Sequence, residues 1–306
     1  MKVLVTGGAG FIGSHLVEAL VAEGHAVCVV DDLSLGRAEN VHPAASFHRV
    51  DIRDAAALEA AFAAERPELV SHHAARANLR RSMEDAALTA QVNVLGSINV
   101  LDLCVKYGVR KAVFASTCAV YPDLESPPAD EAHPVGPLSN YGLSKLVMER
   151  YLAFYRDTAG LRFTAFRYGN VYGPRQDPRG EAGVIAIFGR QLRNGVRPTI
   201  FGDGNKTRDY VYVDDVVDAN LRVMDGRGDG EILNLGWGRE IRDIEVFKAV
   251  RDALGVRLEP HFGPKGPGEM TRVALNSARA RALLGWEPRV RFEEGVPLAL
   301  VLATKG

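Results

Sequence analysis

Cysteine is scarce in this chain: three of its 306 residues, Cys28, Cys104 and Cys118. Such an odd and sparse set of thiols argues against a disulfide framework and favours a reducing compartment. The sequence also lacks a Cys-x-x-Cys pair or a histidine-rich pair at metal-ligand spacing. We therefore expect neither a disulfide framework nor a bound metal.

An excess of charge of one sign is lacking as well. The formal net charge is −1, and no long acidic or basic run occurs, so we expect no nucleic acid and no acidic membrane surface as a partner. No apolar stretch approaches the roughly 20 residues that a membrane-spanning helix needs. The first expected strand, at residues 2–6, leaves no room for a signal peptide before it. These observations predict a cytoplasmic protein.

Apolar residues are plentiful, at 47% of a chain that is long enough for two domains of unequal size. Up to about residue 170, short apolar runs alternate with helical patterns such as 14–23 and 88–106. Near-continuous apolar runs are typical of strands that are covered on both faces. The expected strands are 3–5, 26–30, 69–70, 112–115 and 163–166. This alternation predicts an α/β fold with a parallel sheet and right-handed crossovers.

The composition of the sequence changes after about residue 172, where glycine and proline become frequent at 173–180 and glycine again near 202–204. We therefore predict a cofactor-binding domain at 1–171 and a smaller α/β substrate domain at 172–306. The segment around 207–235 is expected to return to the first domain, so that the two are interleaved.

Residues 7–13 read GGAGFIG, directly after the first expected strand and at the start of a helical pattern. In the Gly-x-Gly-x-x-Gly spacing, one glycine permits a tight turn, one lets the backbone approach a pyrophosphate, and Gly13 allows close packing of helix on strand. The helix beginning at Ile12 would point its free N–H groups at the phosphates. This pattern predicts a dinucleotide site, with a plain strand–helix turn as the alternative.

The second expected strand ends in Asp31 and Asp32. A carboxylate at this position can accept hydrogen bonds from the adenosine ribose and would repel a 2′-phosphate, which favours NAD over NADP. The nearby Arg37 leaves NADP open. A loop or helix-cap role is the alternative for the two aspartates.

Tyr141 and Lys145 stand four residues apart, a spacing that places them on one face of a helix. An ammonium beside a phenol lowers the pKa of the phenol, which can then exchange a proton with a substrate hydroxyl. Ser116 and Thr117, at the end of an expected strand, lie between this pair and the glycine loop in the sequence. We predict a catalytic pair, with a solvated Tyr/Lys pair as the alternative.

Several further segments carry a family resemblance: DIRD at 51–54, HHAA at 72–75, STCAVYP at 116–122, RYGNVYGPRQ at 167–176 and GDGNKTRDYVYVDD at 202–215. With the glycine loop and YGLSK at 141–145, they make the chain resemble the extended short-chain dehydrogenase/reductase family, in its nucleotide-sugar epimerase/dehydratase branch. The resemblance covers nearly the whole chain and implies a Rossmann-type doubly wound parallel sheet.

The resemblance implies a resident NAD and epimerisation at C4 of a UDP-hexose through a 4-keto sugar. Tyr141 would take the proton of the 4-hydroxyl, Lys145 would hold the nicotinamide ribose, and Thr117 would contact the substrate oxygen. Another nucleotide-sugar epimerase, a reductase, or an NAD-binding regulator without catalysis remain as alternatives. Relatives commonly dimerise through two helices, here around 88–106 and 144–157, which implies a homodimer.

The same resemblance assigns individual contacts. Adenine contacts fall to Asp51 and Ile52, and the nicotinamide side to Tyr168. The full set of expected cofactor residues is Gly7, Gly10, Phe11, Ile12, Gly13, Asp31, Asp32, Ser34, Gly36, Asp51, Ile52, His73, Ala74, Ala75, Asn93, Ser116, Tyr141, Lys145 and Tyr168. The expected substrate residues are Thr117, Asn170, Val184, Arg208 and Glu269.

Three departures from the family pattern refine the expectation. Dehydratases of this branch carry an acid pair after the threonine, where this chain has Cys118 and Ala119, so dehydration is disfavoured. Residues 266–269 lack the arginine of many relatives, and Lys265 could replace it. The small Val273 falls where a bulky residue in some relatives excludes N-acetyl sugars, which could therefore be accepted here.

Overall fold

The computed structural model describes residues 1–178, 183–264 and 270–301. Its centre is a seven-stranded sheet in which every neighbouring pair is parallel. In sheet order the strands are β11 (Glu231–Leu235), β6 (Arg162–Tyr168), β5 (Lys111–Thr117), β4 (Leu69–His72), β1 (Lys2–Thr6), β2 (Ala26–Asp31) and β3 (Ser46–Arg49). The order reverses between β1 and β4, and the carboxyl ends of the strands around such a point form the usual ligand crevice. The predicted doubly wound sheet is thereby confirmed.

The five predicted strands are all present and longer than expected, whereas β3 and β11 were not predicted as strands. β3 reads SFHR and lies at the sheet edge with mostly exposed side chains, so it lacks the apolar pattern of a covered strand. β1 illustrates how the sheet is covered. Val3 and Val5 belong to one core cluster and Leu4 to another, because side chains alternate between the faces of a strand.

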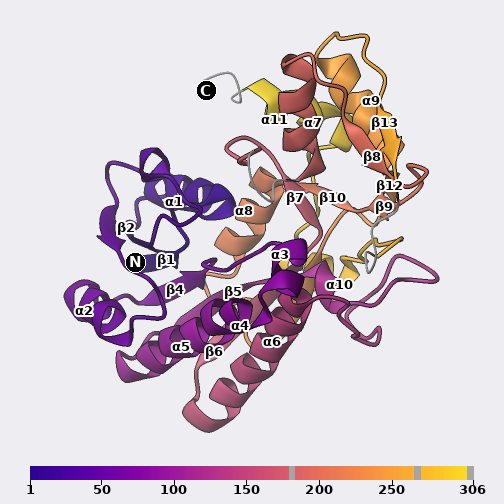
Figure 1. Cartoon of the computed structure of the whole chain (residues 1–306). Coiled ribbons are helices and arrows are strands. Elements are labelled where there is room, and N and C mark those ends of the chain that lie inside the picture. The colour runs from indigo at the N-terminus through magenta and orange to yellow at the C-terminus, as the bar shows by residue number, and fades with distance from the viewer. Residues whose placement is uncertain (179–182, 265–269, 302–306) are drawn as a thin grey trace.

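Helices cover both faces (Figure 1). On one face, α1 (Phe11–Ala22) and α8 (Val213–Arg222) pack on the core that contains Val3 and Val5. The other face carries the core around Leu4 and is covered by α2 (Ala55–Glu65), α5 (Ser97–Lys106) and α6 (Asn140–Ala159).

The predicted helix at 88–106 is helical from Ala86 to Lys106, in three pieces. A π-helical segment, η2 (Gln91–Gly96), joins α4 (Ala86–Ala90) to α5. The whole has 21 residues and contains an 18-residue window with a mean hydropathy of 1.4, so by length and composition alone it could cross a membrane. The expectation that no apolar stretch approaches that length is therefore wrong. In this fold Val100, Leu101 and Cys104 are buried in the core behind the sheet.

The C-terminal part builds a third core from α7 (Val184–Arg193), α9 (Asp243–Ala253) and α11 (Phe292–Val301). Three two-stranded sheets pair β10 (Tyr210–Tyr212) with β7 (Asn170–Tyr172), β12 (Ile241–Arg242) with β9 (Thr207–Arg208), and β13 (His261–Gly263) with β8 (Thr199–Phe201).

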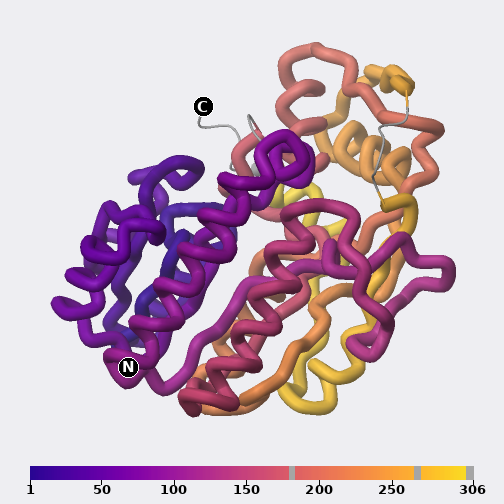
Figure 2. Tube along the Cα trace, turned by 60° about the horizontal axis from the view of Figure 1, so that its bottom comes forward, coloured from indigo at the N-terminus to yellow at the C-terminus, as the bar shows by residue number. Residues whose placement is uncertain are grey.

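Later segments also return to the large sheet (Figure 2). β11 pairs with β6, α10 (Ala278–Leu284) packs on β11, and the fully buried Trp286 donates a hydrogen bond to the carbonyl of Asp215. Elements from both sides of residue 171 thus share one core. The division there stays a prediction.

Candidate active site

The glycine loop turns directly after β1 at the carboxyl edge of the sheet. Gly7 has a φ of +69°, a left-handed conformation that favours glycine. A Cβ on Gly7 would lie 2.7 Å from the Ala74 nitrogen, and one on Gly13 would lie 2.2 Å from the Gly7 oxygen. Gly10 precedes the first helical residue, Phe11, so α1 starts one residue before the expected Ile12. The protein's own backbone therefore requires glycine at positions 7 and 13, and the turn ends at the N-terminus of α1, where free N–H groups can bind an anion.

A cavity of about 340 Å³ opens beside this turn and follows the carboxyl ends of the strands from β1 outward. Many of the predicted cofactor residues line it: Gly7, Asp31, Asp32, Ser34, Gly36, Asp51, Ile52, His73, Ala74 and Ala75. A crevice lined by a glycine turn and by carboxylates fits the adenosine diphosphate half of a dinucleotide.

The two aspartates at the end of β2 differ in their contacts. Asp31 is buried, accepts hydrogen bonds from the Ala9 nitrogen (3.0 Å) and the Leu33 nitrogen (2.8 Å), and has its pKa raised by burial. Asp32 instead closes a turn by accepting from the nitrogen and hydroxyl of Ser34, at 2.8 and 2.6 Å. Asp31 is thus fixed against the glycine turn, as a ribose acceptor would be.

Arg37, which left NADP open, is engaged by carboxylates. Its guanidinium lies 3.1 Å from Glu39 and 3.3 Å from Asp177. These contacts compensate its charge, which weakens the case for a 2′-phosphate ligand.

His73 lies between the cavity and the core. Its ring stacks on Tyr168 at a centroid distance of 6.5 Å, and its Nε2 lies 3.0 Å from the Ser71 hydroxyl. Within the described part of the chain its buried Nδ1 has no hydrogen-bond partner. Burial lowers the pKa of His73 to about 3, so the ring is neutral. An unpartnered buried nitrogen on the cavity wall fits a polar ligand there.

Three residues that were predicted to contact the cofactor form side-chain hydrogen bonds with other residues of the protein. Asn93, in the π-helical segment, accepts from the Arg76 nitrogen (2.8 Å) and donates to the Arg76 carbonyl (3.1 Å) and the Ser144 hydroxyl (2.9 Å). The Ser116 hydroxyl donates to Glu149 at 2.6 Å. The Tyr168 hydroxyl accepts from Asn220 at 2.9 Å. These contacts support structural roles for the three side chains.

Tyr141 and Lys145 lie on consecutive turns at the start of α6, and Thr117 is the last residue of β5. The structure brings these three residues together, as the sequence predicts. The Thr117 hydroxyl accepts from the Ala119 nitrogen at 3.1 Å, and the Thr117 side chain lies close enough to the phenol of Tyr141 to act on its pKa. The ammonium of Lys145 lies 6.0 Å from the centre of the Tyr141 ring and 4.7 Å from that of Phe114. A proton-exchanging hydroxyl, its partner and a cation thus meet at the carboxyl end of β5.

The expected lowering of the Tyr141 pKa is wrong in this structure. Burial raises the pKa of Tyr141 to about 12, although the Thr117 side chain opposes the rise. Burial also lowers the pKa of Lys145 to about 7. The cause is that the ammonium sits over aromatic faces and not at the phenol oxygen, so desolvation of both groups outweighs their attraction.

Three of the predicted substrate residues, Asn170, Val184 and Arg208, lie on β7, α7 and β9. Asn170 begins β7 and donates its backbone nitrogen to the Asp209 carbonyl at 2.6 Å, and Val184 begins α7. Burial raises the pKa of Cys118 and the positive charge of Arg208 opposes that rise, so the charge of Arg208 acts on the residue next to Thr117. Glu269 and Lys265 lie outside the described residues.

Two buried carboxylates were not predicted. Asp209 accepts from the nitrogens of Trp237, Gly238 and Leu275, and burial raises its pKa to about 7. Glu149 follows Tyr141 and Lys145 at the same spacing of four residues. That helical spacing was a signal that could have identified Glu149.

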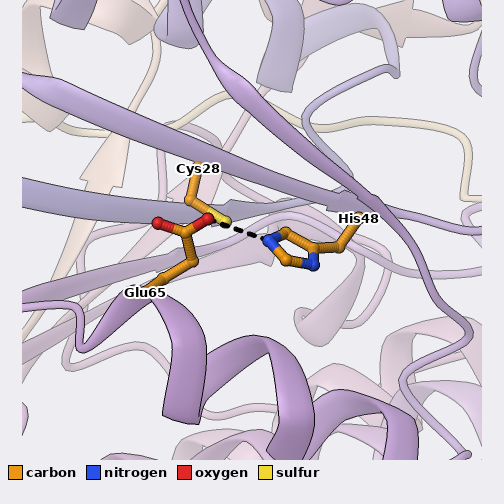
Figure 3. A group of neighbouring side chains, drawn as sticks. All are labelled: Cys28, His48 and Glu65. Atoms are coloured by element: carbon orange, nitrogen blue, oxygen red, sulfur yellow. Dashed lines mark hydrogen bonds and ion pairs between the residues drawn. The ribbon is translucent and has the colours of Figure 1, made fainter.

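Cys28, His48 and Glu65 form a separate cluster near β2 and β3 (Figure 3). Both oxygens of Glu65 are engaged, one by His48 at 2.9 Å and the other by Lys2 at 3.1 Å. Burial raises the pKa of the Cys28 thiol to about 12, so it keeps its proton. The hydrogen bonds of Glu65 therefore explain why these three side chains lie together, without a metal ion being needed.

Comparison with known proteins agrees with this geometry. The family model described as the NAD dependent epimerase/dehydratase family matches residues 3–236. The chain is 45% identical to a UDP-glucose 4-epimerase of Mycolicibacterium smegmatis, over 97% of this chain and 96% of that protein. It is similar to the crystal structure of a UDP-glucose 4-epimerase of Thermotoga maritima with UDP-glucose (TM-score 0.97, 44% identity, 100% and 99% of the two chains). It is also similar to that of a Thermus thermophilus UDP-glucose 4-epimerase with NAD (TM-score 0.95, 45% identity, 99% and 98%).

Proposed function

The chain belongs to the NAD dependent epimerase/dehydratase family, and from this premise we propose that it interconverts UDP-glucose and UDP-galactose with a resident NAD. The observation that carries the proposal is that Thr117 at the end of β5 and Tyr141 at the start of α6 lie together at the carboxyl edge of the sheet, with Lys145 one turn further along the same helix. The bound NAD supplies the hydride acceptor and donor for C4 of the sugar.

Each of four side chains of the site has its own role in this reaction. Tyr141 takes the proton from the 4-hydroxyl as the sugar is oxidised and returns it when the sugar is reduced on its other face. Thr117 orients the same oxygen through its hydroxyl. Lys145 would hold the nicotinamide ribose through its ammonium. Asp31 accepts from the adenosine ribose.

The residues after Thr117 limit the reaction to epimerisation. Elimination of water from a 4-keto sugar needs an additional acid and base. Cys118 and Ala119 offer neither, because Ala119 is inert and burial raises the pKa of the Cys118 thiol to about 11. Return of the hydride is therefore the expected fate of the 4-keto sugar, and dehydration is not.

N-acetyl sugars are a second substrate candidate. Val273 packs in the same small core cluster as Cys118, directly beside the strand end that carries Thr117. The candidate rests on the small size of Val273 at the position where a bulky residue in some relatives excludes N-acetyl sugars. Turnover of UDP-N-acetylglucosamine beside that of UDP-galactose tests the idea, and activity with UDP-galactose alone refutes it.

A homodimer and a cytoplasmic location complete the proposal. Leu95 of η2 and Leu143 and Phe154 of α6 expose 57%, 48% and 58% of their surface. Two such helices from each of two copies would cover these apolar side chains in a four-helix bundle. The three cysteines are unpaired and buried, which suits a reducing compartment.

Purified protein tests the reaction itself. Incubated with UDP-galactose and no added cofactor, it should produce UDP-glucose until the two reach equilibrium, and NAD should co-elute with it in gel filtration. Conversion that depends on added NADPH would indicate the reductase alternative and refute the proposal.

A further inference from the structure

Behind the site, Glu149 of α6 forms a buried ion pair with Arg167 of β6. The Nη2–Oε2 distance is 2.7 Å and the Nε–Oε1 distance is 2.9 Å, and the two side chains are 1% and 6% exposed. The Ser116 hydroxyl donates to the same carboxylate at 2.6 Å. One carboxylate therefore ties a helix to two neighbouring strands.

Each member of this cluster is a close neighbour, along the chain, of a residue of the site. Ser116 precedes Thr117 on β5, and Arg167 precedes Tyr168 on β6. Ser116 is also the register partner of Arg167. Glu149 follows Lys145 by one helical turn, on the face of α6 that carries Tyr141. On each of the three elements, the residue that makes this contact is therefore one residue or one helical turn away from a residue of the site.

The third guanidinium nitrogen of Arg167 also forms a hydrogen bond. Its Nη1 donates to the Tyr121 hydroxyl at 2.8 Å, and that hydroxyl donates to Asn234 of β11 at 2.9 Å. Tyr121 follows the short turn after Thr117. The guanidinium is thus committed to the protein, and the network extends the tie to a third strand and to the loop that follows β5.

We propose that Glu149, through Ser116 and Arg167, is a positioning residue that fixes Tyr141 and Lys145 of α6 relative to Thr117 of β5. The inference rests on the proposed epimerase function. A proton transfer between Tyr141 and a substrate oxygen held by Thr117 depends steeply on their separation, and a displacement of about 1 Å can cost about 100-fold in rate. Glu149 itself contacts neither substrate nor cofactor.

The test is Glu149→Gln, which keeps the size of the side chain and removes its charge. We expect kcat for UDP-galactose to fall by about 10- to 100-fold. The KM and the bound NAD per chain should stay within about two-fold of wild type, because the binding contacts are untouched.

Lys111→Met is the matched control. Lys111 starts β5, is 3% exposed at its side chain, and forms an ion pair with Asp229 at 2.7 Å. The control therefore breaks a buried ion pair at the opposite end of the same strand. It should lower the melting temperature and leave kcat within about two-fold of wild type, because the site is remote.

The outcomes separate cleanly. Unchanged kcat in Glu149→Gln overturns the inference, as does an equal loss of kcat in both variants at an equal loss of melting temperature. If Glu149→Gln does not fold, Ser116→Ala decides. It removes one hydrogen bond, and a several-fold lower kcat supports the inference while an unchanged kcat overturns it. An inactive wild-type protein would instead refute the proposed function.

Discussion

Thr117, at the end of β5, and Tyr141, in the first turn of α6, lie close together at the carboxyl end of the sheet, where the Thr117 side chain counters the rise that burial causes in the pKa of Tyr141. The helix can approach this closely because Gly142 follows Tyr141, and a Cβ there would lie 2.2 Å from the Ala119 oxygen. Proximity of the two hydroxyls lets one sugar oxygen contact both. The first prediction depends on this relationship.

Tyr141→Phe should lower kcat by about 100- to 10,000-fold, because it removes the group that exchanges the proton. Bound NAD per chain should not change. The control is Tyr155→Phe, which removes a phenol on the same helix whose hydroxyl donates to Asp102. Steady-state kinetics of both variants check the prediction, and a fully active Tyr141→Phe would contradict the assigned role.

Lys145 should make stability depend on pH. Burial lowers its pKa in the folded protein to about 7, whereas an unfolded lysine titrates near 10.4. Between these values the unfolded state binds more protons, so the free energy of unfolding should rise as the pH increases from about 7 to about 10. Urea titrations of wild type and Lys145→Met across this range test it. Equal slopes in the two proteins would show that Lys145 has no such effect.

Asp31 should contribute more to NAD binding than Asp32. Loss of a hydrogen bond to a charged group costs about 1.5–3 kcal/mol, so Asp31→Asn should weaken NAD binding by about 10- to 100-fold. Asp32 is bonded to Ser34, and Asp32→Asn should have a much smaller effect. Fluorescence titration of cofactor-stripped protein measures both. Equal losses would mean that the two carboxylates act alike.

The exposed apolar side chains on η2 and α6 should mediate self-association. The double variant Leu95→Glu/Phe154→Glu should be monomeric in sedimentation, because charges would be buried without partners in a helical bundle. The exposed Phe262, far along the chain on β13, offers the control Phe262→Glu. A wild-type monomer, or a double variant that still dimerises, would refute this interface.

The sequence predicts the local features of the site well. The glycine loop and the spacing of Tyr141 and Lys145 are short-range patterns with a direct geometric meaning. The family resemblance is confirmed at 45% identity over nearly the whole chain. Five of the strands were found because they are covered on both faces and therefore continuously apolar.

What the sequence could not supply depends on burial and long-range contacts. The pKa of Tyr141 follows from desolvation and from the position of Lys145 over the rings, which spacing does not reveal. The side-chain partners of Asn93 and Ser116 lie on other elements, so their hydrogen bonds to Arg76 and Glu149 were hidden. β11 was missed as a strand because Glu231 and Asn234 interrupt its short apolar run.

The central claim is that a hydride leaves C4 of the sugar and returns to the same carbon. Incubation with UDP-galactose deuterated at C4, without added cofactor, tests it most directly. The account predicts UDP-glucose that retains the deuterium at C4, measured by mass spectrometry and NMR. Loss of the deuterium to water would contradict it, because it would indicate removal and return of a proton in place of a hydride.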